Sequence, residues 1–213
     1  MLLGLSPFLI RRASALGQYP QGVRKVEGIA SVNGQSAQVG DIVVVGNTVT
    51  TGPGGMVIFV VETAVFLLRE NTRLTLTREN LYESAAVDVI RLLEGKMLGV
   101  FSRRRRKRLL TPTAVVGIRG SGVYTEVDPE TTYLCTCYGR AEIVSAADPT
   151  RRESVRTRHH EAPRYIDAKG NIFKAPVIHH TDEELILLES MAGRRPPFAE
   201  LGTGGNGNGG GGY

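Results

Sequence analysis

The stretch TPTAVVGIRGSGVY, residues 111–124, places β-forming residues on both sides of a short segment that contains Gly117, Gly120 and Gly122. The runs AVVGI and GVYTEV have the composition of two strands. The glycine spacing does not fit a phosphate-binding loop and does not open a helix, and no nucleophile is paired with a base. The stretch therefore favours a β-sheet protein and gives little support to an enzyme.

The same pattern extends in both directions, from residue 23 to residue 147. Short β-branched and aromatic runs alternate with glycine, asparagine and other turn residues. Roughly ten such runs occur, among them IVVV, TVTT, MVIFVV, AVFLLR, TRLTLT and TTYLCTC. MVIFVV lacks alternation between apolar and polar residues, which predicts a strand buried on both faces. The sequence thus predicts an all-β domain over residues 23–147.

Residues 148–193 differ in character and are predicted to form a C-terminal extension. DPTRRESVRTRHHE is typical of a polar connector, and APRYIDAKGNIFKAPVI predicts a hairpin that turns near Lys169 and Gly170. The near-symmetry of this hairpin places Ile166 opposite Phe173 and brings His160 opposite His179. TDEELILLESMAG then predicts a helix that docks on the β domain, with Thr181 as its N-cap in a capping box.

The two ends of the chain are predicted to lie outside the folded domain. MLLGLSPFLIRRASALGQ has an apolar core followed by Ala13-Ser14-Ala15, so residues 1–22 are expected to be an export signal or a disordered N-terminus. The glycine-rich residues 194–213 are expected to be disordered. No transmembrane helix is predicted, because the most apolar internal run is short and carries Glu62. We therefore expect a periplasmic or otherwise exported protein, or a cytoplasmic one if the N-terminus is not a signal.

Several motifs between residues 26 and 146 occur in a familiar order. VGDIVVVGNTVTTGPGG matches a G-D-x-V-x-T-G segment, and AVFLLRENTRLTL and IRLLEGKMLGVF match two strands that follow it. LLTPTAVVGIRGSGVYTEV matches a T-P-x-A-x-x-x-(hydrophobic)-R-G-T-x-(aromatic) core with Ser121 in place of threonine, and TTYLCTCYGRAEIV takes the place of a closing hairpin. Together these motifs resemble the FecR-like domain, the all-β module of bacterial envelope regulators related to the iron-dicitrate sensor.

This resemblance implies a twisted β-roll or short β-solenoid of stacked hairpins, to which the C-terminal hairpin and helix are added. It also implies a non-enzymatic sensor or scaffold module that binds an envelope protein partner or small ligand, in signalling or iron-uptake regulation. Arg119, Ser121 and Tyr124 are candidate contacts, and a structural role across the roll is the alternative for Arg119. Regulators of this family carry a helical sigma-factor-binding segment, but only 22 residues precede the β domain here, so anti-sigma activity is not carried over.

Cysteine and histidine supply the second candidate site. Cys135 and Cys137 lie on one predicted strand, where alternate residues share a face. The predicted hairpin brings His160 and His179 together, and two cysteines with two histidines suit zinc, or copper(I) with more thiolate character. Structural roles and a pH-dependent or redox switch are the alternatives. The second functional prediction is therefore a metal-binding protein that uses Cys135, Cys137, His160 and His179.

A basic run accounts for the positive charge of the chain. The net charge is +5, and six consecutive residues supply it: Arg103, Arg104, Arg105, Arg106, Lys107 and Arg108. We expect a solvated turn between strands, or a loop through which residues 103–108, with the four arginines foremost, contact an anionic membrane surface or an acidic partner. Nucleic acid is not expected as a partner, because no aromatic residues interleave the arginines.

Overall fold

The structure, a computed structural model, describes residues 20–82, 85–103 and 106–200. The predicted export signal therefore falls almost entirely outside the described residues, as do Arg104, Arg105 and the tail beyond residue 200. The predicted fold class is confirmed, because the chain is all-β with a small helical extension. No helix in the described ranges is long and apolar enough to cross a membrane.

One fourteen-stranded sheet contains all the strands of the described chain. They are β1 (Gly22–Glu27), β2 (Ala30–Val32), β3 (Gln35–Ser36), β4 (Thr48–Thr51), β5 (Met56–Val61), β6 (Ala64–Leu68), β7 (Arg73–Tyr82), β8 (Ala85–Val100), β9 (Lys107–Leu110), β10 (Ala114–Val127), β11 (Thr131–Ser145), β12 (Arg152–Thr157), β13 (Arg164–Asp167) and β14 (Ile172–Lys174). The helix α1 (Asp182–Met191) and the 3-10 helix η1 (Pro197–Glu200) follow. All pairings are antiparallel except β8 with β9.

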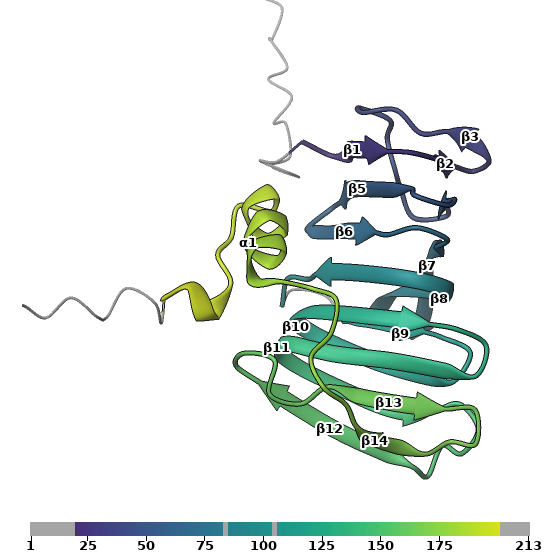
Figure 1. The fold of residues 1–213 in the computed structure, drawn as a ribbon, viewed down its shortest axis with the longest axis vertical. Coiled ribbons are helices and arrows are strands. Elements are labelled where there is room, and N and C mark those ends of the chain that lie inside the picture. The colour runs from purple at the N-terminus through teal and green to yellow at the C-terminus, as the bar shows by residue number, and fades with distance from the viewer. Residues whose placement is uncertain (1–19, 83–84, 104–105, 201–213) are drawn as a thin grey trace, which may run out of the picture.

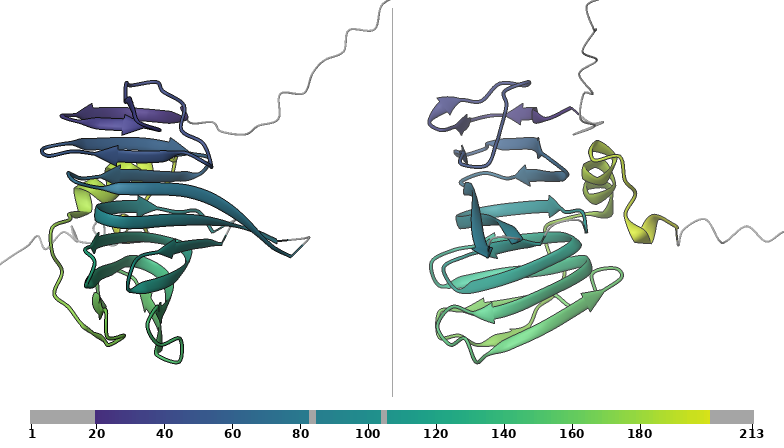
Figure 2. Two further views of the ribbon diagram at one scale, coloured as in Figure 1. Left: turned by 90° about the vertical axis from the view of Figure 1, so that its right-hand side faces the viewer. Right: turned by 180° about the vertical axis from the view of Figure 1, so that it is seen from behind.

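The strands stack from β1 at one end of the molecule to β12–β14 at the other, and α1 lies against one side of the stack (Figure 1). β7 and β8 project beyond the rest of the stack (Figure 2, left). β8 and β10 hold the stack together because each changes partner along its length. The first part of β10 pairs with β9, and its second part pairs with β8. The sheet therefore curls into a roll.

β10 and β11 both bend at one corner of the roll. β10 bends within the GIRGSG segment, residues 117–122, and β11 bends at the residues that lie opposite this segment. The pairing of β10 with β11 shifts between Arg119 and Gly122. Gly120 and Gly139 have φ angles of 58° and 96°, a region that side chains other than glycine rarely occupy. The Ser121 hydroxyl donates toward the Arg119 and Arg140 carbonyls, at 3.2 and 3.0 Å, and accepts from the Arg140 N–H at 2.9 Å. The serine thus satisfies the backbone that the bulge leaves without ladder partners.

Two apolar clusters occupy the two faces of the roll. β5 and β6 contribute to both, since Phe59 and Phe66 face the interior cluster while Val60 and Val65 face a second cluster under α1. This confirms that MVIFVV is a strand buried on both faces. Helix α1 begins at the predicted capping box of Thr181 and places Leu185 and Leu188 in the second cluster. α1 therefore covers a face of the sheet that would otherwise expose apolar side chains.

Three segments differ from their predicted structure. The IVVV run, residues 42–45, is a loop, in which the N–H and the carbonyl of Val44 bond locally to Asn47 and not to a neighbouring strand. The predicted connector after residue 147 contains β12, which pairs with residues 139–144 of β11 and so belongs to the same sheet. Residues 194–200 are ordered, since Phe198 is buried and the Arg194 guanidinium pairs with Glu189 at 2.5 Å.

The C-terminal hairpin forms, but its register is one residue away from the prediction. The loop has three residues, 168–170, because the Asp167 N–H donates to the Asn171 carbonyl at 3.1 Å. Tyr165 therefore faces Phe173 and Ile166 faces Ile172. The predicted pairing of Ile166 with Phe173, from which His160 opposite His179 followed, does not form. A one-residue slip matters because it exchanges the two faces of a strand.

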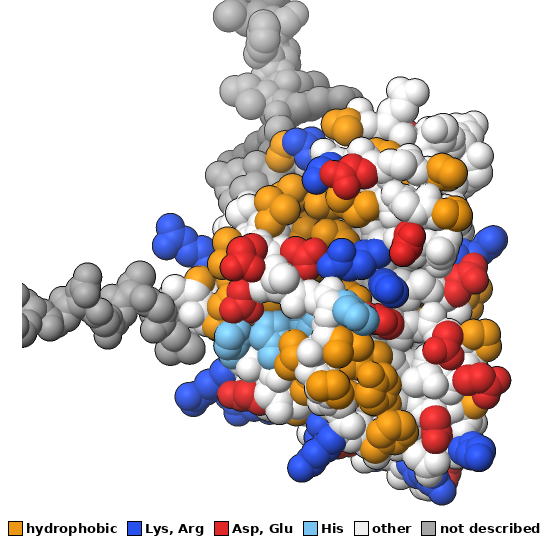
Figure 3. Space-filling model, in the orientation of Figure 1, with side chains coloured by type: hydrophobic (Ala, Val, Ile, Leu, Met, Phe, Trp, Pro, Cys, Tyr) orange, Lys and Arg blue, Asp and Glu red, His pale blue; other side chains and the backbone are white. Residues whose placement is uncertain are grey.

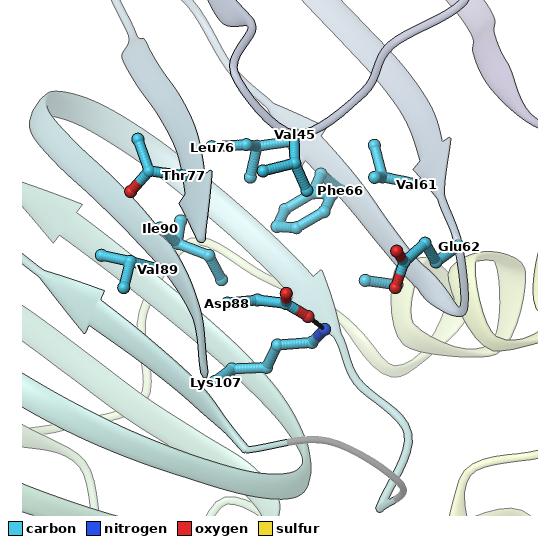
Figure 4. A pocket seen from close by; sticks show the side chains of 11 residues that line it. Val45, Val61, Glu62, Phe66, Leu76, Thr77, Asp88, Val89, Ile90 and Lys107 are labelled. Carbon is cyan, nitrogen blue, oxygen red and sulfur yellow. Dashed lines mark hydrogen bonds and ion pairs between the residues drawn. The ribbon is translucent and has the colours of Figure 1, made fainter. Parts of the chain in front are cut away.

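The basic run is not a simple solvated turn. Its last two residues begin β9, where Lys107 is only 5% exposed and pairs with Asp88, itself 7% exposed. The Asp88 carboxylate also accepts from the Arg78 guanidinium at 2.8 Å. Apolar side chains of β6, β7 and β8 surround the pair, which lines a small cavity (Figure 4). Arg108 pairs with Glu79, whereas Arg103 and Arg106 are exposed as predicted.

Candidate metal centre

Cys135 and Cys137 lie side by side on the face of β11 that α1 covers. Both side chains are fully buried and neither forms a disulfide. As predicted, the Cys-x-Cys spacing in an extended strand turns both sulfur atoms toward the same face. The Cys137 S–H lies 3.7 Å from the Cys135 carbonyl oxygen, a weak interaction that leaves its sulfur available.

Two histidines approach these sulfur atoms from two other segments. His160 follows β12 and is anchored because its backbone N–H donates to the Cys137 carbonyl at 2.8 Å. His180 directly precedes the N-cap of α1. The four side chains each offer one ligand atom, and these atoms all lie within 4.8 Å of one another. In the space-filling view the histidines gather beside the lower end of the region that α1 occupies (Figure 3).

The hydrogen bonds on the far sides of the two rings determine which nitrogens face the centre. The His180 Nδ1 lies 2.6 Å from the Ile178 carbonyl, which can only accept, so Nδ1 carries the hydrogen. The His160 Nε2 lies 3.0 Å from the Asp182 carboxylate and is a donor for the same reason. In both neutral rings the remaining nitrogen therefore presents a lone pair. These two lone pairs, on His160 Nδ1 and His180 Nε2, face each other at 3.0 Å.

This arrangement requires a positive charge between the rings. A shared proton would supply one, and a metal ion would supply another. In a tetrahedral zinc site, bond lengths of about 2.0–2.1 Å to nitrogen and 2.3 Å to sulfur separate two nitrogens by about 3.3 Å and a nitrogen from a sulfur by about 3.6 Å. The observed separations are 3.0 Å between the histidine nitrogens and 3.4 Å from His160 Nδ1 to Cys135 Sγ. These two separations are close to those of a zinc site, and since the four ligand atoms all lie within 4.8 Å of one another, the more widely spaced atoms would move inward to bind zinc.

The outer partners of the histidines are also those that a metal site requires. A ligating imidazole usually donates its other N–H to a carboxylate or a backbone carbonyl, which orients the ring and raises its basicity. Asp182 has this position behind His160, and the Ile178 carbonyl has it behind His180. Asp182 also accepts from the exposed His159 Nε2 at 2.8 Å. Asp182 lies in the first turn of α1, so the helix is tied directly to the cluster.

The charges of the cluster are strongly coupled. Hydrogen bonding from the Cys137 thiol, with smaller contributions from His160 and His180, lowers the pKa of Cys135 to about 4 against the opposing effect of burial. Burial raises the pKa of Cys137, and the neighbouring sulfur raises it further. Burial also opposes ionisation of His160, but Cys135 and Asp182 outweigh it and raise its pKa. One thiolate and one imidazolium therefore form readily, and both are states that a metal ion replaces.

The structure gathers three of the four predicted ligands and replaces the fourth. His179 is 63% exposed and its Nδ1 lies 2.6 Å from the Glu126 carboxylate, away from the cysteines. His180, which directly precedes the N-cap of α1, takes the predicted place, while His179, whose backbone is left-handed with φ of 52°, turns toward Glu126. A stacking partner fixes His180, since the Tyr124 ring lies 4.5 Å from it and nearly parallel. The sequence did not point to Asp182, because it is one of several acidic residues in the first turn of a helix, where acidic residues are common.

The other predicted contact residues have different positions. Ser121 and Tyr124 are fully buried, so they belong to the bulge and to the wall of the cluster. Arg119 is exposed, and its guanidinium has no hydrogen-bond or ion-pair partner among the described residues, so the expected bonds to carbonyls or an acid across the roll do not form. Arg103, Arg106 and Arg119 line adjoining hollows, while Arg104 and Arg105 lie outside the described residues.

No family model and no curated protein matches the sequence. The fold is similar to two solved structures, at 1.65 and 2.50 Å, of a "putative anti-sigma factor" from Parabacteroides distasonis ATCC 8503. The TM-scores are 0.51 and 0.50 at 14% identity, over 67% of this chain and 64% of the other. The likeness thus spans less than two thirds of the Parabacteroides chain. It establishes a shared fold.

Proposed function

We infer that this chain is a non-enzymatic regulatory module that binds zinc through Cys135, Cys137, His160 and His180. The observation that carries the proposal is the convergence of four ligand atoms within 4.8 Å, with two histidine lone pairs directed at the same point. The Cys₂His₂ set is typical of closed, structural zinc sites. The ligands come from β11, from the segment after β12 and from the segment before α1. A bound ion would therefore connect the roll to its C-terminal helix.

Zinc would act on the module by fixing this helix. Leu185 and Leu188 already attach α1 to the roll, and their burial contributes roughly 1.5–3 kcal/mol each. Metal ligation adds a second attachment at the N-terminal end of α1, through His180 and through Asp182 behind His160. Occupancy of the centre then stabilises the docked helix relative to the released one, because a ligand stabilises the state to which it binds. The module would report metal availability as a change in its C-terminal segment.

A catalytic use of the same residues is disfavoured by burial. Cys135, His160 and Asp182 stand in the order of nucleophile, base and orienting acid, with separations of 3.4 and 3.0 Å. The Cys135 sulfur, however, belongs to a side chain with 0% exposure beneath α1. A substrate would have to displace the helix to reach it. The buried Cys₂His₂ set is better suited to holding an ion than to attacking a substrate.

A cell-envelope location and a protein partner complete the proposal. The export-signal pattern in residues 1–22 supports the location, and the resemblance to the FecR-like domain supports a role in signal transmission. The fold shared with the Parabacteroides protein is consistent with a regulator that acts by protein contact. The partner would recognise the module according to the position of α1.

The test is a measurement of zinc binding by the full chain purified under reducing conditions. Metal content by plasma mass spectrometry should give one zinc per chain, and cobalt(II) in its place should give the charge-transfer absorption of thiolate ligands. Cys135→Ser and His180→Asn should remove both signals. His179→Asn is the matched control, because it removes the adjacent histidine, which lies outside the cluster, and should leave zinc binding unchanged.

Circular dichroism of each variant should show the β spectrum, so that loss of metal is not confused with loss of fold. Folded wild-type protein that binds no zinc would overturn the proposal. Equal damage from His179→Asn and His180→Asn would overturn the assignment of the fourth ligand.

A further inference from the structure

Three arginines form a straight row across three neighbouring strands. Arg119 of β10 is paired in register with Arg140 of β11, and Arg140 is paired with Arg156 of β12. These strands lie beside one another at the lower end of the stack (Figure 1). Directly opposed residues in a sheet have their Cβ atoms about 4.5–5.5 Å apart on the same face. All three side chains are exposed, so the row lies on the outer surface of the roll.

Such a row is unfavourable by itself. Like charges directly opposite each other destabilise a sheet, and Arg140 has one on each side. Arg103 and Arg106 approach the row from the basic run, and Arg158 continues it beyond Arg156. Among the described residues, none of these six guanidinium groups has an acidic partner. The module therefore carries a concentrated positive charge that no ion pair within the described chain neutralises.

The arginines line two hollows that share Arg119 and Arg140. One hollow has a volume of about 350 Å³ and the other about 850 Å³. Two carboxylates, Glu142 and Glu161, are the only acidic residues in their linings. We call these two adjoining hollows, lined by arginines from Arg106 to Arg158, the basic trough. Adjoining hollows that share two arginines can be occupied by successive side chains of one extended peptide.

We propose that this basic trough binds an acidic peptide segment of a protein partner. Guanidinium groups hold carboxylates through paired, charge-assisted hydrogen bonds, and successive carboxylates on an extended peptide can engage successive arginines. A membrane surface is flat and would contact the rim of the trough only. A nucleic acid strand would require exposed aromatic rings for stacking, and the one aromatic residue in the lining, Tyr138, is buried. This inference does not depend on the metal centre.

The test is fluorescence anisotropy with a labelled ten-residue polyglutamate peptide and the full chain at low salt. The double variant Arg119→Gln with Arg140→Gln should weaken binding about tenfold or more, because charged hydrogen bonds are lost at two adjacent sites. The matched control, Arg24→Gln with Arg73→Gln, removes the same net charge from exposed arginines far along the chain and should change affinity less than about twofold.

The melting temperature of each variant shows whether a loss of peptide affinity is caused by a loss of stability. Arg140→Gln alone should raise the melting temperature, because it removes repulsion on both sides, while Arg24→Gln should leave it unchanged. Equal loss of peptide affinity in the test and control variants would show non-specific charge attraction and overturn the proposal. Binding to vesicles that contain anionic lipid, or to single-stranded DNA, with no binding to the peptide would overturn it as well.

Discussion

The buried ion pair of Asp88 and Lys107 gives a sharp test of how the basic run is integrated into the fold. Lys107 is 5% exposed and is paired with Asp88, whereas Asp88 is also held by Arg78 at 2.8 Å. Removing one member of a buried pair leaves an uncompensated charge and costs about 3–5 kcal/mol. Asp88→Asn leaves the buried Lys107 ammonium without its acidic partner, so this full cost is expected. Lys107→Met leaves Asp88 with Arg78, so its cost should be lower, about 1–3 kcal/mol.

The double variant distinguishes desolvation from simple loss of contacts. Asp88→Leu combined with Lys107→Met removes both buried charges, and such replacements are often close to neutral because the cost of burying the charges disappears as well. The unfolding free energy from urea titration should therefore fall most for Asp88→Asn and least for the double variant. Each kcal/mol corresponds to a shift of about 2–4 °C in melting temperature for a domain of this size.

The pH dependence follows from the same pair. Burial opposes ionisation of Asp88, but hydrogen bonds from Lys107 and Arg78 outweigh it and lower its pKa below the ordinary value. A carboxyl with a lowered folded-state pKa contributes stability above its unfolded pKa of about 3.9, and this contribution is lost as the pH falls through the folded value. The stability difference between wild type and Asp88→Asn should hence shrink below about pH 4. Two results would refute this reasoning. One is a double variant that is less stable than Asp88→Asn, and the other is a stability difference between wild type and Asp88→Asn that stays constant below about pH 4.

Two further variants test the packing of α1 and the corner of the roll. Leu188→Ala should lower the unfolding free energy by about 2–5 kcal/mol, because it opens a cavity under α1, whereas Ile186→Ala on the exposed side should have little effect in the same urea titration. Gly139→Ala should cost about 1–3 kcal/mol, since φ is 96° and the new Cβ would lie 2.4 Å from the Gly120 carbonyl oxygen, and calorimetry against Gly117→Ala, whose Cβ meets no atom closer than 3.7 Å, provides the comparison. Equal melting temperatures within either pair would contradict the corresponding account.

Local patterns of the sequence predicted the features that depend on neighbouring residues. The fold class, the two-sided burial of MVIFVV and the capping box at Thr181 all follow from alternation or from fixed short spacings. The common face of Cys135 and Cys137 follows from the period of a strand. These predictions needed no knowledge of what the rest of the chain does. They therefore account for the half of the proposed metal centre that lies on β11.

The other half depends on the hairpin and on the path of the chain from it to α1, which the sequence specifies less directly. A two-residue turn near Gly170 and a three-residue loop over 168–170 fit the same letters, and they differ by one position along the whole hairpin. His160, His179 and His180 lie beyond the paired residues of the hairpin, so the left-handed backbone at His179 and the start of α1 decide which of the two adjacent rings meets the sulfur atoms. The identity of the fourth ligand is therefore a property of the assembled fold.

The arginine row is a second feature that the sequence does not reveal, because it forms only when the strands pair. In the sequence, Arg103 to Lys107 attract attention because they are consecutive, yet Lys107 is buried and paired with Asp88. Arg140 attracts none, because it stands alone among uncharged and acidic neighbours in β11, and Arg156 lies in the segment DPTRRESVRTRHHE, which the sequence indicates only as a connector. Their positions become meaningful only when β10, β11 and β12 pair and bring them into line. Surface charge that arises from strand pairing acts as one continuous feature, so its function has to be tested by changing residues from different strands together.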